Sequence, residues 1–325
     1  MGLLENLRYR SEQLYRLRSF FRERNFVEVQ TPVLSADTVV DQHVEPIAVT
    51  DSSFPPTQHG GQTYYLRTSP EFAMKRLLSA GMEAIYEIGT VFRQGERGQF
   101  HNVEFTMLEW YRVGDNYQAG MNLLAELIRF IDIDKMLPEV VYCSFGDIFR
   151  QYTGVNPHRA TAAEYREVAV RQHIPYPDSL TETMETEDWI DLLFSELVQP
   201  NLQSAIVYDF PATQSQLAQT RIITDTVGAV AVSERYELFL NGIEVANGYH
   251  ELLDATELRQ RFRKNLRQRL AAKRRELPIE SRLLTAMELG LPASCGTALG
   301  VDRLLMVLLH ANSIDDVLPF PIETC

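Results

Sequence analysis

Residues 86–112, YEIGTVFRQGERGQFHNVEFTMLEWYR, decide the fold of this chain. β-Branched and aromatic residues run from 86 to 93, two glycines with polar neighbours break the run, and a second alternating run follows over 103–112. Runs of this kind are typical of strands, and Gly with polar residues is typical of turns. The stretch therefore predicts two strands joined by a polar loop.

Side chains alternate between the two faces of a strand, so parity assigns the residues of the second strand. One face receives Val103, Phe105, Met107, Glu109 and Tyr111. This face combines an aromatic plate, a carboxylate and a phenol, and Arg93 enters the loop beside it. Because an unpaired buried carboxylate is costly, Glu109 indicates a functional site. The simpler interpretation is a half-buried hairpin whose charges lie at its edges.

The composition limits the class of protein. A chain of 325 residues with 45% hydrophobic content suits one large domain, or a domain with a sizeable insertion. It has no apolar run of membrane-spanning length and no signal peptide, so we expect no membrane association. Three cysteines without metal or redox spacing favour a reducing cytoplasm. Neither a Walker A loop nor a GxGxxG motif after a strand is present.

The formal charge of −13 argues against a general nucleic-acid binder, because phosphate contacts need Lys and Arg. Residues 259–275, RQRFRKNLRQRLAAKRR, nevertheless hold nine Lys or Arg and no acid, so the remaining chain carries 22 basic against 44 acidic residues, formally −22. We expect one positive helix on a negative body. It is either a solvated face or a docking patch for an acidic partner.

The chain opens with a predicted amphipathic helix that ends near residue 24, followed by a short strand over 26–30. The helix places Leu7, Leu14, Leu17 and Phe21 near one face. These elements either cap the core or lie in a dimer interface. A polar loop rich in Pro and Gly follows over 50–63.

A second helix is predicted over 70–80, because Ser69 is a good N-cap, Pro70 suits the first position and Gly81 suits the stop. Glu71 then lies in the first turn. It either complements the helix dipole or receives a ligand ammonium. Residues 113–205 predict an inserted helical region, with helices at 117–131, 161–172 and 187–198, and we assign it no chemistry.

Residues 235–252, RYELFLNGIEVANGYHEL, predict a hairpin with Asn-Gly at its turn. Phe239 then pairs with Glu244, and Glu237 is a diagonal neighbour of Glu244 on the same face. Two carboxylates so placed repel each other but can share Mg²⁺ with phosphate oxygens. Asn247, Tyr249 and Glu251 have the opposite parity. For all of them to face one pocket, a bulge is needed near residues 246–248.

The last segment, GLPASCGTALGVDRLLMVLL (290–309), predicts a short strand that feeds a helix with Asp302 and Arg303 in its first turn. An Arg beside a helix N-terminus opposes the dipole, and a phosphate there would reverse that penalty. The alternative is a surface ion pair between Asp302 and Arg303 or a neighbour.

Taken together, three segments resemble motifs 1, 2 and 3 of class II aminoacyl-tRNA synthetases: the first helix and strand ending at Pro32, then FRQGERGQFHNVEFTMLEWY, then GTALGVDRLLM. TSPEFAMKRLL, HNVEFTMLEWY and GIEVANGYHEL are similar to the lysyl branch. The resemblance implies an α+β fold, with an antiparallel sheet flanked by helices. It also implies one catalytic domain over 1–325, which contains the 113–205 insertion.

Two features resemble the elongation factor P lysine ligases more than lysyl-tRNA synthetases. We expect no N-terminal anticodon-binding barrel, and Ala298 stands in GTALG where synthetases usually have Gly. The resemblance implies ATP and Mg²⁺ as cofactors, (R)-β-lysine as substrate, elongation factor P as protein partner, tRNA as an improbable partner, and a homodimer through the N-terminal helix and strand. The alternatives are a lysyl-tRNA synthetase-like enzyme and a non-catalytic regulatory paralogue.

The resemblance also implies roles for individual residues. It places Arg93 at the α-phosphate of ATP, Phe105 against adenine and Arg303 at the γ-phosphate, with the two arginines as the catalytic residues. Glu96, His101, Asn102 and Glu244 complete the implied nucleotide site. Glu237 and Glu244 would hold Mg²⁺. The implied amino-acid pocket comprises Glu71, Glu109, Tyr111, Asn247, Tyr249, Glu251 and Ala298. In one departure, Gly95 stands where the family's second motif has Glu, so either Glu96 replaces that Glu through a shifted loop or a polar contact is lost.

Overall fold

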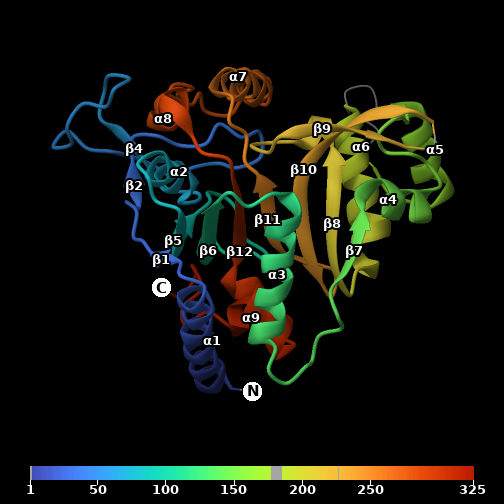
Figure 1. The fold of residues 1–325 in the computed structure, drawn as a ribbon, viewed down its shortest axis with the longest axis horizontal. Coiled ribbons are helices and arrows are strands. Elements are labelled where there is room, and N and C mark those ends of the chain that lie inside the picture. The colour runs from blue at the N-terminus through green and yellow to red at the C-terminus, as the bar shows by residue number, and fades with distance from the viewer. Residues whose placement is uncertain (1, 177–184, 226) are drawn as a thin grey trace. The chain divides into compact units, whose positions relative to one another are not determined.

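The computed structural model describes residues 2–176, 185–225 and 227–325. It divides into two compact units, the first formed by residues 1–133 with 251–325 and the second by residues 134–250 (Figure 1). The mixture of helices with mainly antiparallel strands confirms the α+β class. No helix among the described residues is long and apolar enough to cross a membrane.

The first unit is built on the two strands predicted from residues 86–112. They form β5 (Ala84–Phe92) and β6 (Glu104–Val113), which pair in antiparallel register. β12 (Ser294–Gly300) adds to the other edge of β6, and the short β1 (Val27–Glu28) pairs with β5 in parallel. The resulting strand order β1–β5–β6–β12 brings together segments that lie more than 200 residues apart.

Register places small residues of β12 opposite polar residues of β6. Ala298 pairs with Glu109, and Gly296 pairs with Tyr111. A Cβ atom at Gly296 would lie 2.2 Å from the Tyr111 ring and 2.4 Å from Glu251 Oε1. Only glycine therefore allows these two side chains to approach the strand.

Helices and a small sheet complete the first unit. The helices are α1 (Leu3–Glu23), α2 (Glu71–Ser79), α3 (Tyr117–Ile131), α7 (Ala255–Ala271), α8 (Arg282–Gly290) and α9 (Val301–Leu309), with a 3-10 turn η5 (Ile314–Asp316). The small sheet has the order β2 (Leu34–Ser35), β4 (Thr63–Leu66) and β3 (Ala48–Thr50). α8 packs against both α2 and α7, and the three lie together at the top of Figure 1.

The predicted apolar face of α1 is only partly correct. Leu17 and Phe21 are buried as expected, and Phe21 stacks on Tyr86 with ring centroids 4.7 Å apart. Leu7 and Leu14 are only half-buried. The buried face is turned toward Phe20 and also covers the polar Asn6 and Gln13, because the aromatic cluster on β5 and β6 selects which side of the helix packs.

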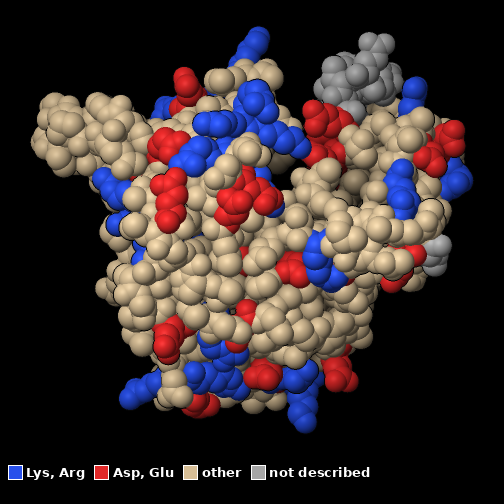
Figure 2. All heavy atoms as spheres, turned by 45° about the horizontal axis from the view of Figure 1, so that its top comes forward, with Lys and Arg blue, Asp and Glu red and all other residues tan. Residues whose placement is uncertain are grey.

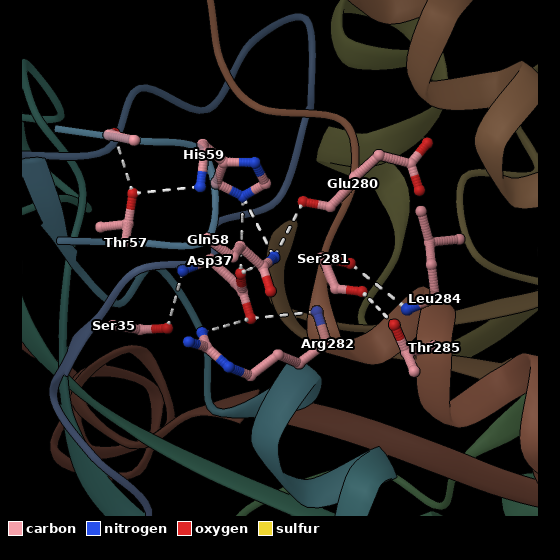
Figure 3. Close-up of polar contacts among 11 residues, drawn as sticks. Ser35, Asp37, Thr57, Gln58, His59, Glu280, Ser281, Arg282, Leu284 and Thr285 are labelled. Carbon is pink, nitrogen blue, oxygen red and sulfur yellow. Dashed lines mark hydrogen bonds and ion pairs between the residues drawn. The ribbon is translucent and has the colours of Figure 1, made fainter.

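Asp37 ties the polar loop over 51–62 to the start of α8 (Figure 3). Its carboxylate accepts hydrogen bonds from Gln58 Nε2 at 3.1 Å and from the backbone N and the side chain of Arg282 at 3.1 and 3.2 Å. Gln58 also donates to the carbonyl of Glu280. The segment between α7 and α8 is therefore held in place by a carboxylate that is itself buried.

The second unit contains the predicted helices together with elements that the pattern did not predict. Helices at 161–172 and 187–198 are confirmed as α5 (Ala162–Arg171) and as α6 (Thr186–Leu193) with the π-turn η2 (Phe194–Val198). The helix at 117–131 is also confirmed, as α3 of the first unit. The additional elements are β7 (Val141–Ser144), α4 (Phe145–Thr153), η3 (Gln199–Asn201), β8 (Ser204–Pro211), η4 (Ala212–Gln214) and β9 (Thr220–Thr224).

Strands of the second unit follow the order β7–β8–β10–β11, with β9 also on β10. The Asn241–Gly242 turn joins β10 (Ala229–Leu240) to β11 (Ile243–His250), which confirms the predicted hairpin and the Phe239–Glu244 pair. The register shifts between Leu238 and Phe239, so Glu237 pairs with Asn247. The required bulge is therefore present, about one residue earlier than predicted.

Candidate active site

A buried acidic cluster lies on the face of β6 that parity predicted. The side chain of Glu109 is 1% exposed; it accepts hydrogen bonds from Ser69 Oγ at 2.7 Å and Tyr111 Oη at 2.5 Å. Ser69 also accepts from the backbone N of Glu71, so it caps α2 as predicted. The loop before α2 and the strand β6 thus hold Glu109 jointly.

Lys75 lies within the same cluster, one turn after Glu71 on α2. Its ammonium is 2.6 Å from Glu71 Oε1 and 2.5 Å from Glu251 Oε2, and its side chain is 2% exposed. The bond to Glu71 spans i to i+4 on the helix, where side chains meet. Glu71 therefore has a role beyond the helix dipole: it shares a buried cation with Glu251, a residue nearly 200 positions away.

Burial dominates the acid–base behaviour of this cluster. Burial, together with the charge of Glu71, raises the pKa of Glu109 to about 7, and burial raises the pKa of Glu251 to about 8 although Lys75 opposes it. Burial works against the charged form of Lys75, but the two carboxylates still raise the pKa of its ammonium. With every group ionised, three carboxylates face one ammonium. The cluster is therefore short of positive charge, and a ligand with ammonium groups fits it.

Arg93 stands at the start of the loop between β5 and β6. Its guanidinium carbon lies 5.3 Å from the centroid of the Phe105 ring, and its Nη1 lies 3.7 Å from Glu96 Oε1. Within the described part of the chain, no group accepts a hydrogen bond from its buried Nε. A phosphate oxygen would satisfy that donor, and the Phe105 ring offers a stacking surface for a base. The proximity of Glu96 is consistent with this residue acting in place of a Glu at position 95.

Arg303 contacts the same loop from the first turn of α9. Its Nε donates to the carbonyl of Phe100 at 3.2 Å, and its Nη2 contacts His101 Nε2. Asn102 is buried; it donates to the carbonyl of Glu104 and accepts from the backbone N of Ile322. Arg303 therefore lies against His101 of this loop, and Asn102 fixes the loop's backbone. Whether Arg93 faces the same site stays a prediction.

Asp302 differs from the expected surface ion pair. It is 1% exposed, pairs with Arg10 of α1 and accepts from the backbone N of Thr106 at 2.7 Å. The alternative of an ion pair between Asp302 and Arg303 is wrong. Asp302 lies on the side of α9 that contacts α1 and β6. Arg303 is left facing the loop.

The second unit carries a second acidic group on the hairpin. Glu237 is 6% exposed and pairs with Arg235, two residues earlier on β10. Burial raises the pKa of Glu237 to about 7, although Arg235 opposes this, and the charge of Glu244 adds to the rise. The negative charge of Glu244 therefore acts on the carboxylate of Glu237. No cluster of three or more His, Cys, Asp or Glu occurs among the described residues, so a metal here would rely on this pair.

Asn247 and Tyr249 follow on β11. Asn247 Nδ2 donates to Tyr249 Oη at 3.1 Å, and Tyr249 Oη contacts Gln216 Oε1. No described residue donates to the buried Oδ1 of Asn247. This orphan acceptor is available for a ligand donor. Whether the hairpin residues and the cluster around Glu109 line one pocket stays a prediction.

Sequence reasoning missed several residues of these clusters. They are Lys75, Arg235, Arg10, and Ser69 in its role as a hydrogen-bond donor to Glu109. For Lys75 a signal was available, because Glu71 and Lys75 are four apart on a predicted helix. Arg235 and Glu237 share one face of a predicted strand. Arg10 had no local signal, since its partner lies in the last helix.

Comparisons with known proteins identify the family of this chain. The sequence profile of the family described as tRNA synthetases class II (D, K and N) matches residues 2–324. The chain is 38% identical to an elongation factor P–(R)-β-lysine ligase of Sodalis glossinidius, over 98% of this chain and 96% of that protein. It is 39% identical to ligases of the same name from Proteus mirabilis and Pasteurella multocida, over 98% of this chain and 95% and 96% of theirs. The chain therefore belongs to the class II tRNA synthetase family (D, K and N), in the branch that holds the elongation factor P–(R)-β-lysine ligases.

Proposed function

We propose that this enzyme is a ligase that activates (R)-β-lysine with ATP and transfers it to the ε-amine of a lysine on elongation factor P. Its relatives at 37–39% identity over nearly their whole length carry this name. The observation that carries the proposal is the charge balance of the cluster formed by Glu71, Lys75, Glu109 and Glu251. With all three carboxylates ionised, the cluster lacks two positive charges, which matches a substrate with two ammonium groups.

The nucleotide side of the reaction rests on the loop between β5 and β6. Arg93 would bind the α-phosphate of ATP, because its buried Nε lacks an acceptor within the described residues. Phe105 would stack on adenine, and Arg303 with His101 would bind the far end of the triphosphate. Fixed guanidinium groups of this kind stabilise charge on phosphoryl oxygens without reorganising during the reaction.

Glu237 and Glu244 are suited to a magnesium ion. Mg²⁺ prefers oxygen ligands and is usually held by one or two carboxylates together with substrate phosphates. Burial raises the pKa of Glu237 and the charge of Glu244 adds to the rise, so a cation between the two carboxylates would offset their repulsion. When bound, the metal would neutralise charge on the phosphate oxygens.

The reaction then needs two displacements. In the first, a carboxylate oxygen of the amino acid attacks the α-phosphorus of ATP, the bond to the β-phosphate oxygen breaks, and pyrophosphate leaves. In the second, the uncharged ε-amine of the acceptor lysine attacks the carbonyl carbon of the adenylate, an amide forms, AMP leaves, and the amine loses a proton. Glu71, Glu109 and Glu251 would hold the ammonium groups throughout, while Arg93 would donate hydrogen bonds to the oxygens of the α-phosphate. No side-chain nucleophile is required.

A homodimer through α1 and β1 is part of the proposal. Four large apolar side chains of these elements are 45–73% exposed: Leu3, Leu4, Tyr15 and Val27. Burial of such side chains in a partner copy would remove them from water. Sedimentation velocity would test this, with Leu4→Lys combined with Tyr15→Lys expected to give monomers. We also propose a cytoplasmic location, which suits the three cysteines, all described and all free thiols.

The deciding experiment is ATP–pyrophosphate exchange with α-lysine, (R)-β-lysine and (S)-β-lysine, followed by mass measurement of elongation factor P. We expect exchange to be fastest with (R)-β-lysine, and elongation factor P to gain one β-lysyl group without tRNA. RNase treatment should change neither rate. Charging of tRNA that RNase abolishes would favour the lysyl-tRNA synthetase alternative, and ligand binding without exchange would favour a non-catalytic paralogue.

A further inference from the structure

Eight of the nine Lys and Arg residues over 259–275 divide into an internal group and an outward group. Arg269 is fully buried; it donates to the carbonyls of Asp41 and Val44 and pairs with Glu45 at 2.6 Å. Arg269 therefore belongs neither to a solvated face nor to a docking patch. Arg259 pairs with Glu280 and Glu288, and Arg261 pairs with Glu257. These three arginines are structural.

The outward group forms what we call the basic surface: Arg263, Arg267, Lys273, Arg274 and Arg275, all exposed. Arg263 and Arg267 are four residues apart on α7, opposite the buried Leu258 and Phe262, so both face away from the protein. The other three follow the end of the helix. Figure 2 shows Lys and Arg side chains gathered over α7. These five residues thus form one basic region that faces outward from the first unit.

The basic surface continues into a hollow of about 550 Å³. Arg274 and Arg275 line it together with His43, Glu45, Gln94, Gly95 and Glu96. The last three belong to the loop that also carries Arg93. Gly95 has φ +80 and no atom within 4 Å of where its Cβ would lie, so this side of the hollow is open. A partner that sits on the basic surface would therefore touch the loop that binds the reacting phosphate.

We propose that the basic surface and this hollow dock an acidic face of the protein that accepts the amino acid. The inference rests on the proposed function. An acidic partner is repelled by a body of formal charge −22 and attracted by the basic surface, which orients the encounter. The patch also lies beside the loop at which the adenylate is made. A second macromolecular anion, tRNA, is the competing occupant, and the net charge of −13 disfavours it.

The test compares two double charge reversals that change the net charge equally. The first is Arg263→Glu with Arg267→Glu on the basic surface. The control is Lys135→Glu with Arg166→Glu, two exposed residues of the second unit. A further variant, Arg274→Ala with Arg275→Ala, probes the hollow without reversing charge. For each protein, pyrophosphate exchange with (R)-β-lysine reports adenylate formation, and mass spectrometry reports the rate of elongation factor P modification.

We expect both surface variants to keep the parent exchange rate and kcat for modification, while KM for elongation factor P rises at least about tenfold near 50 mM salt and by less near 300 mM, where charges are screened. The control should match the parent. Equal KM values for parent and surface variants would overturn the docking surface, and so would an equal loss in the control. Weaker tRNA binding with unchanged protein modification would assign the surface to nucleic acid instead. A parent that exchanges pyrophosphate but never modifies elongation factor P would overturn the proposed function, and the docking surface with it.

Discussion

Each unit of the molecule buries carboxylates beside an internal cation, but the two cations are held differently. In the first unit, the ammonium of Lys75 contacts Glu71 and Glu251, so its position depends on those carboxylates. In the second unit, Arg235 pairs with Glu237, donates to the carbonyl of Gln214 and lies 4.6 Å from the centroid of the Phe210 ring. Arg235 would stay in place if Glu237 turned to another partner.

This difference matches two kinds of ligand. In the first cluster Lys75 remains between its carboxylates, and the charge that is still unbalanced can be neutralised by ammonium groups of a ligand. This suits an organic diamine. A carboxylate whose cation has other contacts can exchange that cation for a metal, which suits Glu237 and Glu244. The first cluster should therefore lose stability and activity when Lys75 is replaced. The second should lose its metal binding when Glu237 is replaced.

Replacing Lys75 by Met should have the largest effect. It leaves Glu251 buried beside Glu71 without a positive charge, and breaking a buried pair in this way costs about 3–5 kcal/mol. We expect urea unfolding to show a loss of that size at pH 8, and pyrophosphate exchange to fall by about 10³-fold. The loss should be largest at high pH and shrink as the pH falls, because burial raises the pKa of Glu251 and the replacement of Lys75 removes the charge that lowers it.

Arg76→Met is the matched control for Lys75→Met. Arg76 is the next residue of α2 and is exposed, so its loss should change the free energy of unfolding by less than about 0.5 kcal/mol. If both variants unfold at the same urea concentration, Lys75 is not the charge on which the first cluster depends.

Replacing Glu237 by Gln should have the next largest effect, and it acts on the reaction rather than on the fold. Arg235 keeps its contacts with Gln214 and Phe210, so we expect the thermal midpoint to change little. Exchange should fall by about 100-fold, and the Mg²⁺ concentration for half-maximal rate should rise, because a carboxylate ligand is lost. Glu196→Gln, an exposed site of the same unit, should match the parent. An unaltered Mg²⁺ requirement in Glu237→Gln would exclude the metal role.

Replacing Ala298 by Gly should produce a smaller change, in substrate preference. Ala298 pairs with Glu109 across β12 and β6, so its methyl group points to the side of the ammonium pocket. One methyl group in a pocket is worth about tenfold or more in discrimination. We expect the ratio of kcat/KM for (R)-β-lysine over α-lysine to fall about tenfold in exchange assays. Ala293→Gly, just before the same strand, should leave the ratio unchanged.

The strands and the hairpin were predictable because their patterns are local. Alternation over 86–112 predicted β5 and β6, and Asn241–Gly242 predicted the turn and the first pair of the ladder. Parity also predicted that Glu109 and Tyr111 share a face, which their hydrogen bond confirms. The need for a bulge followed from parity as well. Its place did not, because packing on the neighbouring strand β8 contributes to the register.

Charge partners that are distant in sequence were not predictable from the pattern. Lys75 meets Glu251 and Asp302 meets Arg10 only because β6 and β12 bring the two ends of the chain together. The same cause makes Arg269 structural, although its neighbours on α7 are exposed. Helical periodicity predicts the face on which a residue lies. It does not predict which residue contacts that face, because the tertiary fold decides this.

The smallest expected effect is a pH dependence that separates the free pocket from the loaded one. Burial raises the pKa values of Glu109 and Glu251 to about 7 and about 8, above the ordinary 4.5, so the folded protein holds protons that the unfolded chain has released. The stabilising contribution is complete below pH 4.5 and is lost as pH rises through 7 to 8. We therefore expect the free energy of unfolding without ligand to decrease over that window.

A ligand with two ammonium groups favours the ionised carboxylates, so its binding should release protons near pH 7 and tighten a few-fold by pH 8.5. Calorimetry in two buffers of different ionisation enthalpy measures this release, and Glu109→Gln should reduce it. An ammonium group bound beside a neutral carboxyl group makes that carboxyl release its proton. Proton uptake on binding would therefore mean that Glu109 and Glu251 do not receive the ammonium groups.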